Sequence, residues 1–556
     1  MVGNISKEKR EQLLNKINEI KSFISEKESD GRFTGYLNEL ANEINSKKYG
    51  LVFESHRESV DEILDNNIPV FTENEKHLIP SGKVNFLLEG DNLATLTLLQ
   101  KTHKGAIDVI YIDPPYNTGN NDFVYDDKMV DNNDSYRHSK WLSFMDRRLR
   151  LAHCLLKESG VILISIDDNE KSQLKLLCDG IFGEENSLGV FVVKSTPNAR
   201  DYGHIGKQHE YMLFYGKDSR FVSTNMMPDL DKKFKYSDEI GGFNIHPLYN
   251  SNEAFTNLNR PNLFYPFYLN PLNKKGDFYE ISLEKKEGWI EIYPPKSVKN
   301  GVQFVWRWGR EKSLENINKE IVGYCNGGTE YRVVQKMRHS EKIIRSILDD
   351  SAYTTRRGTA EVESIMGNKN FSFPKPLKLI RDVLYMATKQ DSVVLDFFAG
   401  SGTTGQAVME LNKEDCGNRQ FILCTNNQNE ICEQVTFERL KRVIENENYQ
   451  EGLKYFKIDY VDTQDKVFYE YSSELLQHIK ELVELENGID FKNNQTVRIA
   501  LTEDEIDEII ANPVEMEQIK KIYVGHDVML GAGQVATFNK NNIEVVIIPN
   551  YYYSEQ

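Results

Sequence analysis

The pattern of apolar and polar residues divides the chain into regions of different character. Residues 7–25 carry apolar side chains at helical spacing, which predicts an amphipathic helix in a polar N-terminal stretch. The residues of this stripe are Leu13, Leu14, Ile17, Ile20 and Phe23. From Val84 onward, short apolar runs alternate with helical patterns, which predicts an α/β fold with a parallel-type sheet.

The predicted strands and helices of this α/β region lie in two segments of the chain, one before residue 220 and one after residue 365. The strands are Val84–Glu89, Ile107–Ile112, Gly160–Ile166, His209–Gly216, Val393–Phe397 and Phe421–Thr425. The helices are Ala94–Gln100, His138–Glu158, one after Pro376, one beginning near Thr403, and Ile431–Asn446. Residues 220–365, rich in Asn, Tyr, Phe, Pro and Gly, break the alternation and predict a large insertion with short irregular elements. The tail after residue 450 predicts a helical stretch, Glu474–Glu486, and a closing strand, Ile543–Ile548.

Length and composition restrict the class of protein. A chain of 556 residues exceeds what one hydrophobic core usually serves, so we expect a catalytic domain with accessory regions. The sequence has no apolar run of membrane-spanning length, and its first ten residues lack the apolar core of a secretory signal. We therefore expect a cytoplasmic location and no membrane contact. The six cysteines form no Cys-x-x-Cys pair, so we expect neither a bound metal nor a disulfide.

The net charge of −17 is unevenly distributed along the chain. Residues 191–390 sum to +8, so the remainder carries −25, and residues 461–556 alone contribute −11. Because charges are screened beyond about 8 Å at physiological salt, a local basic face is enough for phosphate contacts. The overall acidity therefore does not exclude nucleic acid as a partner.

One candidate motif is an apolar strand that runs into a glycine-containing turn and then a helix. It comprises Leu395, Asp396, Phe397, Phe398, Ala399, Gly400, Ser401, Gly402, Thr403 and Thr404. Glycines at the carboxyl end of a strand let the backbone approach a ligand, and the N–H groups of the next helix face it. The spacing differs from the dinucleotide fingerprint, and no phosphate-binding Lys follows the second glycine. A Gly-x-Gly turn of this kind is by itself also compatible with a purely structural role.

The second motif, Asp113-Pro114-Pro115-Tyr116, follows the predicted strand Ile107–Ile112. The tandem prolines hold the backbone extended and rigid. The Asp113 carboxylate and the Pro114 carbonyl can both accept hydrogen bonds from one –NH₂ group, and Tyr116 offers an aromatic face on which a base can stack. This arrangement at the carboxyl edge of a sheet indicates a site for an amine on a planar ring.

These residues resemble the amino-methyltransferases of DNA. In that family the Asp-Pro-Pro-Tyr tetrad holds the target amine and the Phe-x-Gly-x-Gly loop, here beginning at Phe398, holds S-adenosylmethionine. The tetrad precedes the loop by almost 290 residues, an order similar to that of the permuted β class, whose insertion is the target-recognition domain. The resemblance implies a Rossmann-like, circularly permuted methyltransferase fold of the α/β class with an inserted recognition domain and a C-terminal accessory domain.

Further segments resemble the family's cofactor site. The segment with Phe373, Lys375 and Pro376 resembles the part that holds the methionine moiety, and Asp91 and Asn92 resemble the strand end that meets the cofactor's adenine. The residues that the resemblance assigns to the cofactor are Asp91, Asn92, Asp113, Phe373, Lys375, Pro376, Asp396, Phe397, Phe398, Ala399, Gly400, Ser401, Gly402, Thr403, Thr404 and Asn426. The chain departs from the pattern at Asn426, where the family usually has an acidic ligand of the ribose.

The resemblance also implies a division of the chain and its partners. We expect an N-terminal helical region at 1–80, methyltransferase parts at 81–220 and 366–450, a target-recognition domain at 221–365, and a dimerisation or docking domain at 451–556. Four features resemble the modification subunit of Type III restriction–modification systems. They are the segments Arg260–Pro266 and Trp306–Arg310, the strand ending Thr425-Asn426-Asn427, and the long acidic tail. That closer match implies double-stranded DNA as substrate, a homodimer, and a restriction subunit as a further partner. A stand-alone adenine or N4-cytosine enzyme, or an RNA methyltransferase, are the alternatives.

The expected chemistry is transfer of a methyl group to adenine N6, with the base flipped out of the duplex. Asp113, Pro114, Pro115 and Tyr116 are the expected catalytic residues. Enzymes of the family that act on cytosine N4 more often have Ser at the position of Asp113, which favours adenine. The expected DNA contacts are Asn117, Tyr211, Trp306, Arg307, Arg310, Arg332, Arg356 and Arg357, with Trp308, Lys336 and Arg338 as further candidates in the same basic region.

Overall fold

A computed structural model of the 556-residue chain describes most residues from 51 to 553. The gaps are residues 52, 120–123, 126–127, 130–133, 199–203, 230, 328–329, 369–370 and 465, and of the first 50 residues only 13–18, 20–21, 37 and 40 are described. The described part of the predicted N-terminal helix is helical at 13–18 and 20–21. Of its apolar stripe, Ile17 is buried, whereas Leu13 and Ile20 are exposed, and Phe23 lies outside the described residues.

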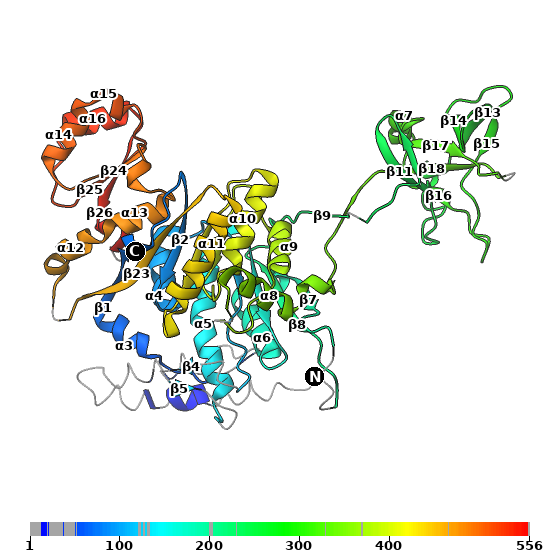
Figure 1. Ribbon diagram of the computed structural model, residues 1–556. Coiled ribbons are helices and arrows are strands. Elements are labelled where there is room, and N and C mark those ends of the chain that lie inside the picture. Colours follow the sequence, from blue (N-terminus) through cyan, green and yellow to red (C-terminus); the bar gives the residue numbers. More distant parts are fainter. Residues whose placement is uncertain are drawn as a thin grey trace. The chain divides into compact units, whose positions relative to one another are not determined.

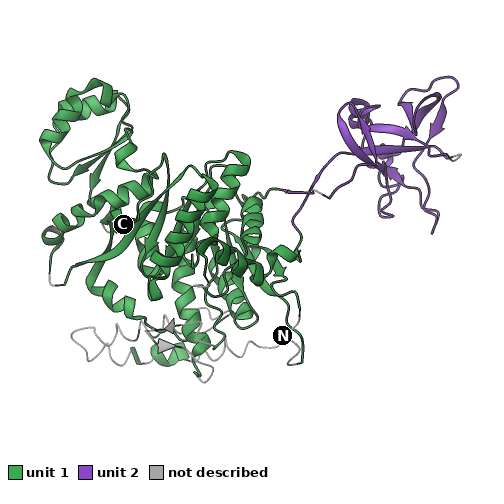
Figure 2. Cartoon of the chain, in the orientation of Figure 1, with its two compact units in different colours: residues 1–225, 345–556 green, residues 226–344 purple. Residues whose placement is uncertain are grey.

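The chain divides into two compact units (Figure 2). Unit 1 comprises Met1–Asn225 and Arg345–Gln556, and unit 2 comprises Met226–Ile344. Unit 2 is narrower than the insertion expected at 221–365. Residues 345–365 belong to unit 1, where β20 (Ile347–Leu348) pairs with the main sheet and α8 (Thr355–Met366) packs against α11 (Glu438–Glu447). Residues 345–365 contain one glycine and no asparagine or proline, so the composition already changes where the chain re-enters unit 1.

Unit 1 is built around a ten-stranded sheet in the order β1-β23-β2-β22-β21-β3-β6-β8-β7-β20 (Figure 1). The strands are β1 (Asn67–Glu73), β2 (Lys83–Glu89), β3 (Ile107–Ile112), β6 (Leu156–Ile166), β7 (Ser187–Val193), β8 (Glu210–Gly216), β20, β21 (Val393–Asp396), β22 (Gln420–Thr425) and β23 (Glu451–Asp462). The five central strands, β2, β22, β21, β3 and β6 in spatial order, run parallel to one another, whereas β8 is antiparallel to both β6 and β7. The sheet is therefore mixed, with the predicted parallel strands at its centre.

Two groups of helices flank this sheet (Figure 1). One contains α4 (Asn92–His103), α5 (Arg137–Leu155) and α6 (Lys171–Phe182), and the other contains α8, α9 (Leu377–Ala387), α10 (Thr403–Asp415) and α11. The predicted helix His138–Glu158 ends three residues early, because β6 begins at Leu156. The predicted helix Ile431–Asn446 begins as a π-helix at Ile431–Phe437 and continues as α11.

The ends of the chain contribute more to unit 1 than the sequence indicates. β1, expected within a helical region, pairs with β23, expected in a separate tail, and β23 pairs with β2. The predicted helix Glu474–Glu486 is two helices, α12 (Phe468–Gln477) and α13 (Ile479–Asn487), which meet at His478.

A small parallel sheet follows these helices. Its order is β24 (Val497–Ala500), β25 (Lys521–Gly525) and β26 (Glu544–Ile548), with α14 (Glu503–Ala511), α15 (Pro513–Met516), α16 (Ala532–Lys540) and α17 (Asn550–Tyr553). One face, with Tyr523 and Val546, joins the main core, and the other has its own cluster with Ile522 and Val524. The small sheet is therefore continuous with the main core on one side, because alternate residues of each strand face it.

Unit 2 contains a seven-stranded antiparallel sheet where the sequence indicated short irregular elements. Its strands, in spatial order, are β10 (Tyr236–Asp238), β11 (Gly241–Pro247), β18 (Arg332–Met337), β17 (Ile321–Tyr324), β14 (Phe278–Ser282), β13 (Phe267–Lys275) and β15 (Ile290–Ile292). Two strand pairs, β9 (Met227–Pro228) with β19 (Glu341–Lys342) and β12 (Tyr249–Asn250) with β16 (Val305–Trp306), and helix α7 (Arg310–Asn316) complete the unit. Most of these strands are too short for a clear alternating pattern, which is why the sequence conceals the sheet.

Across the residues that the structure describes, every helix is too short or too polar to cross a membrane.

Candidate functional site

A large cavity of about 1110 Å³ opens at the carboxyl ends of the central parallel strands of unit 1. Its wall includes residues that directly follow β2, β3, β21 and β22, namely Gly90, Asp113, Phe397 and Asn426. The direction of winding changes between β21 and β3, and such a switch point leaves a crevice between neighbouring strands. Of the residues expected to bind the cofactor or act in catalysis, all line this cavity except Pro376 and Gly402.

The glycine loop, Phe398–Gly402, has a left-handed backbone at both of its glycines. Gly400 and Gly402 have φ angles of 49° and 77°, and Gly402 is the N-cap of α10. A side chain at Gly400 would meet the Phe371 ring at 3.1 Å, and one at Gly402 would meet the Thr436 methyl group at 3.2 Å. Only glycine meets both demands, so the loop can bring backbone N–H groups to the cavity wall.

Arg439, on α11, holds this loop from behind and was not identified from the sequence. The fully buried guanidinium donates to Ser401 Oγ at 2.8 Å, to Thr403 Oγ1 at 2.7 Å and to Gln406 Oε1 at 2.9 Å. Burial lowers the pKa of Arg439 to about 10, which leaves it charged at neutral pH. No local pattern relates Arg439 to residues more than thirty positions away, so only the fold reveals the contact.

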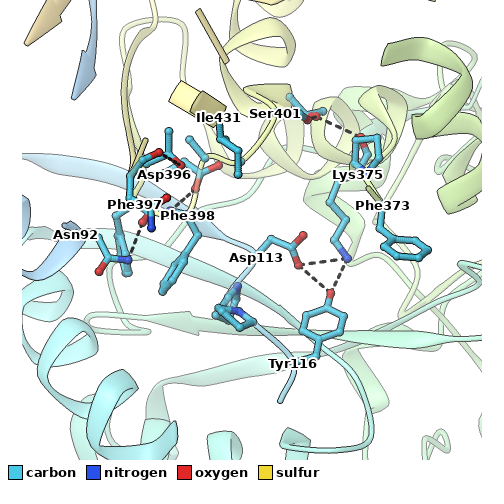
Figure 3. Close-up of a pocket in the computed structure, with 18 of the residues that line it drawn as sticks. Asn92, Asp113, Tyr116, Phe373, Lys375, Asp396, Phe397, Phe398, Ser401 and Ile431 are labelled. Carbon is cyan, nitrogen blue, oxygen red and sulfur yellow. Dashed lines mark hydrogen bonds and ion pairs between the residues drawn. The ribbon is translucent and has the colours of Figure 1, made fainter. Parts of the chain in front are cut away.

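A second buried arginine supports the part of the wall at the end of β2. Arg148 is fully buried on α5 and donates to both carboxylate oxygens of Glu58, at 2.7 and 3.0 Å, and to Asn92 Oδ1 at 2.5 Å. The Asn92 amide donates to the Phe397 carbonyl at 3.1 Å, which links the end of β2 to the residue that precedes the glycine loop (Figure 3). Asp91 caps α4 by accepting from the N–H of Leu93 at 2.7 Å. The polar groups at the end of β2 are thus fixed in orientation.

The Asp-Pro-Pro-Tyr tetrad lies across the cavity from these groups. The Pro115 carbonyl accepts a hydrogen bond from the buried Trp141 indole at 2.7 Å, which fixes the turn. The Tyr116 hydroxyl donates to Asp113 Oδ1 at 2.8 Å. Burial raises the pKa of Tyr116 well above its usual value, so the phenol remains a donor. The carboxylate is therefore held by its own turn and points into the cavity.

The Lys375 side chain contacts both Asp113 and Tyr116 of the tetrad (Figure 3). Its Nζ donates to Tyr116 Oη at 2.5 Å and to Glu210 Oε1 at 2.8 Å, and it lies 3.3 Å from Asp113 Oδ1. Burial acts to lower the pKa of Lys375, but the Asp113 and Glu210 carboxylates outweigh it and the pKa is raised. Burial raises the pKa of Glu210, which Lys375 offsets in part. The sequence assigned Lys375 to the cofactor. Glu210 lies in the segment His209-Glu210-Tyr211, which resembles a family motif near the flipped base, but the sequence assigned Glu210 no role of its own.

Asp396, at the end of β21, is a buried acid with few compensating charges. Its carboxylate accepts from the Phe398 N–H at 2.9 Å and from the Thr404 hydroxyl at 2.5 Å. Burial raises the pKa of Asp396 to about 7, and the two hydrogen bonds oppose that rise only in part. Its charge state therefore changes close to neutral pH.

A stability prediction follows from the raised pKa of Asp396. Between pH 4 and pH 7, the folded protein holds a proton that the unfolded chain has released, since the unfolded pKa is about 3.9. This group's contribution to stability is therefore fully present below pH 4 and is lost as pH rises to 7. The Asp396→Asn variant lacks this term, so its Tm relative to wild type, measured without cofactor, is expected to rise from pH 4 to pH 7. A Tm difference that is constant with pH would contradict the assignment.

The structure contradicts two of the expected DNA contacts. Asn117 is fully buried, and its amide donates to Glu170 Oε1 at 2.5 Å and to the Arg137 carbonyl at 3.3 Å. Trp306 is 1% exposed in the core of unit 2, where its indole donates to the Tyr265 carbonyl at 2.7 Å. Both residues hold their own loops. A polar or aromatic residue beside a motif does not reveal from the sequence alone which way its side chain points.

The remaining candidate contacts are divided between the two units. Arg307, Arg310 and Arg332 are exposed in unit 2, whereas Arg356 and Arg357 are exposed on α8 in unit 1. Tyr211, in β8, is partly buried with the Lys171 ammonium 3.7 Å from its ring centroid. The further candidates include Trp308, which packs against the core of unit 2, and Lys336 and Arg338, which both form ion pairs with Asp238.

The basic excess is spread more widely than expected. Unit 2 contains 18 Lys and Arg against 15 Asp and Glu, so its net charge is +3 of the +8 found over residues 191–390. The balance comes from the flanking segments of unit 1. Basic residues in both units are therefore available for phosphate contacts.

Comparison with known proteins identifies the family to which this site belongs. The family model described as DNA methylase, of the N6 and N4 methyltransferases, matches residues 107–437. The Type II methyltransferase M.KpnI of Klebsiella pneumoniae is 36% identical over 393 residues, covering 70% of this chain and 89% of that protein. The EcoPI Mod subunit of a Type III restriction–modification enzyme, from Escherichia phage P1, is 35% identical over 371 residues. That match covers 61% of this chain and 57% of the Mod subunit.

Solved structures give weaker overall likenesses. The PvuII DNA methyltransferase, described as cytosine-N4-specific, has a TM-score of 0.34 at 11% identity and covers 67% of this chain and 98% of its own. The M1.HpyAVI–SAM complex has a TM-score of 0.30 at 13% identity, covering 64% and 98%. The family match spans the tetrad, the insertion and the cofactor loop, and the tetrad and the loop are the segments that form the cavity. The chain belongs to the N6/N4 family of S-adenosylmethionine-dependent DNA methyltransferases.

Proposed function

We propose that this chain transfers a methyl group from S-adenosylmethionine to the N6 amine of an adenine flipped out of duplex DNA. The observation that carries the proposal is the Asp113 carboxylate, held by Tyr116 and facing the cofactor loop within one cavity. The Asp at this position favours adenine over cytosine, because N4-specific members of the family more often have Ser there. A flipped base and the donor can then meet without the protein entering the duplex stack.

The residues of the cavity fit S-adenosylmethionine. The loop around Gly400 and the N-terminus of α10 present N–H donors to its carboxylate, and Asp91 and Asn92 present polar groups to its adenosine. Asn426 and Gln428 line the wall after β22, where an amide can hydrogen-bond the ribose in place of the usual carboxylate. When bound, the cofactor supplies an activated methyl group on a positively charged sulfur.

The protein's part in the chemistry is to orient and activate the amine. The amine lone pair is delocalised into the ring, and hydrogen bonds to Asp113 and the Pro114 carbonyl favour the tetrahedral nitrogen in which it is localised. Held in this way, the amine would take up the methyl group that the bound cofactor supplies, and the methylated, cationic nitrogen would release one proton to solvent. Because positive charge develops on the nitrogen, its bonds to Asp113 strengthen in the transition state.

The experiment that tests this function is single-molecule sequencing of DNA from cells that express the chain. The expected result is N6-methyladenine at one short sequence, strongly reduced when the Asp113→Ala variant is expressed. Modification at cytosine would refute the adenine assignment, and undiminished modification with the variant would refute the role of Asp113.

We further propose that unit 2 and its flanks bind DNA through the exposed arginines. Replacing Arg307, Arg310 and Arg332 together with alanine is expected to weaken DNA binding and to reduce the salt dependence of the affinity. The slope of log K against log[salt] should fall by about 0.9 for each phosphate group that the variant no longer binds. Fluorescence anisotropy at several salt concentrations measures this slope, with Arg150→Ala as a control, since Arg150 is exposed on α5 and pairs with Asp146 in unit 1, away from the flanks of unit 2. An unchanged slope would show that these arginines bind no phosphate.

The partners of the chain follow from the same relatives. We propose a modification role in a restriction–modification system, with a homodimer as the working form and a separate restriction subunit as the cleaving partner. The chain spans 89% of M.KpnI but only 57% and 52% of the EcoPI and StyLTI Mod subunits. Light scattering of the purified chain tests the dimer, and its methylation activity without any partner distinguishes a self-sufficient methyltransferase from a subunit that needs another protein.

A further inference from the structure

A donor and an acceptor stand side by side in the cavity. The Lys375 ammonium and Asp113 Oδ1 are 3.3 Å apart, and Figure 3 shows both pointing into the same space beside Tyr116. Lys375 comes from the segment that precedes α9, and Asp113 comes from the turn after β3. Because Asp113 is assigned to the target amine in the proposed function, whatever lies against Asp113 also lies next to Lys375.

The chemistry of the bases explains what such a pair can recognise. The edge of adenine that carries the N6 amine presents an N–H donor next to a ring nitrogen that accepts, and the corresponding edge of cytosine does the same. Guanine and thymine present a protonated ring nitrogen instead, and a lysine ammonium has donors only. Two donors facing each other in a buried site are unfavourable.

We propose that Lys375 reads the target base by donating a hydrogen bond to the ring nitrogen next to the reacting amine, while Asp113 accepts from the amine itself. This inference rests on the proposed function and adds a specificity determinant to it. It moves Lys375 from the cofactor, where the sequence places it, to the base. The selected substrates would be the amino bases, adenine and cytosine, against guanine and thymine.

Lys375 can exchange its contact with Asp113 for one with the base because a second carboxylate, that of Glu210, continues to pair with its charge. Glu210 Oε1 holds the ammonium at 2.8 Å, and the side chains of both residues are nearly buried, with 11% and 12% exposed. When a base enters, the longer Lys375–Asp113 contact is replaced by one bond from each group to the base edge. Glu210 keeps the ammonium charged and aimed throughout. Lys375 is therefore a positioning and specificity residue, and the amine is activated by Asp113.

The test compares ordinary DNA with DNA that carries 1-deazaadenine, which has a C–H group in place of the ring nitrogen, at the mapped target position. Wild-type enzyme and Lys375→Met are assayed on both DNAs. On the analogue, kcat/KM is expected to fall about 10–100-fold more for the wild-type enzyme than for the variant. This ratio corresponds to the loss of one hydrogen bond from a charged donor. Taking the ratio of the two losses removes any intrinsic change in amine reactivity. The variant's Kd for S-adenosylmethionine, measured by calorimetry, should stay within about twofold of wild type.

Controls separate this role from a structural one. Lys378→Met, on the adjoining turn of α9, removes a lysine that pairs with Asp382 outside the cavity and should leave the analogue penalty at its wild-type value. Lys375→Gln, which also removes the ammonium, serves if the methionine variant does not fold. The same analogue penalty in wild type and variant, or a large loss of cofactor affinity in the variant, would overturn the proposal. Failure of the wild-type enzyme on ordinary adenine would instead overturn the proposed function.

Discussion

Replacing Asp113 with alanine is expected to lower methyl transfer by about 10²–10³-fold or more, because it removes the acceptor that stabilises the developing positive charge on the amine. The Kd for S-adenosylmethionine should change little, since the glycine loop and the β2 end remain. A filter assay with radiolabelled methyl donor gives the rate, and calorimetry gives the affinity.

The control for this prediction is Asp146→Ala, which removes a carboxylate that pairs with the exposed Arg150 on α5, outside the cavity. It should leave the rate close to that of wild type. Asp113→Asn keeps the shape of the side chain and an acceptor oxygen, so it should retain more activity than Asp113→Ala. Substantial transfer by the alanine variant would show that the amine is held elsewhere.

Replacing Lys454 with methionine is expected to destabilise unit 1 by about 3–5 kcal/mol, the usual cost of leaving buried charges without their partner. Lys454 is 1% exposed in β23, and its ammonium lies 3.1 Å from Glu73, 2.6 Å from Glu484 and 3.1 Å from Asp490. Without it, three nearly buried carboxylates remain together. Urea denaturation followed by circular dichroism measures the decrease in the free energy of unfolding.

Two variants make the Lys454 prediction specific. Lys480→Met removes a lysine that is 42% exposed and pairs with the same Glu73, and it should cost no more than about 1 kcal/mol. Adding Glu484→Gln to the Lys454→Met variant should recover part of the stability, because one uncompensated charge is removed. Equal destabilisation by the two lysine variants would mean that the buried cluster has no special weight.

The sequence singled out the two motifs that the structure brings to one cavity. The tetrad and the glycine loop are short segments in which the chemistry depends on consecutive residues, and each follows a strongly apolar strand. Because parallel strands end at one edge of a sheet, the two motifs were expected to meet, and the structure brings them to one cavity. The parallel arrangement of the central strands was likewise predicted from the alternation of apolar strands and helices along the chain.

What the sequence could not predict depends on long-range pairing. Arg148 and Glu58 are separated by 90 positions and Arg439 and Ser401 by 38, so no local pattern indicates these contacts. The assignment of Trp306 to DNA was wrong because exposure is set by the fold of unit 2 and not by nearby arginines. β23 was placed in a separate tail because one strand has no periodic feature that indicates which sheet it joins.

The most direct test of the central claim is mass spectrometry of nucleosides from DNA incubated with the purified chain and deuterated-methyl S-adenosylmethionine. The account predicts deuterated N6-methyladenine, formed by wild type about 10²–10³-fold or more faster than by Asp113→Ala. Labelled N4-methylcytosine in its place, or no labelled nucleoside from DNA containing the mapped sequence, would contradict it.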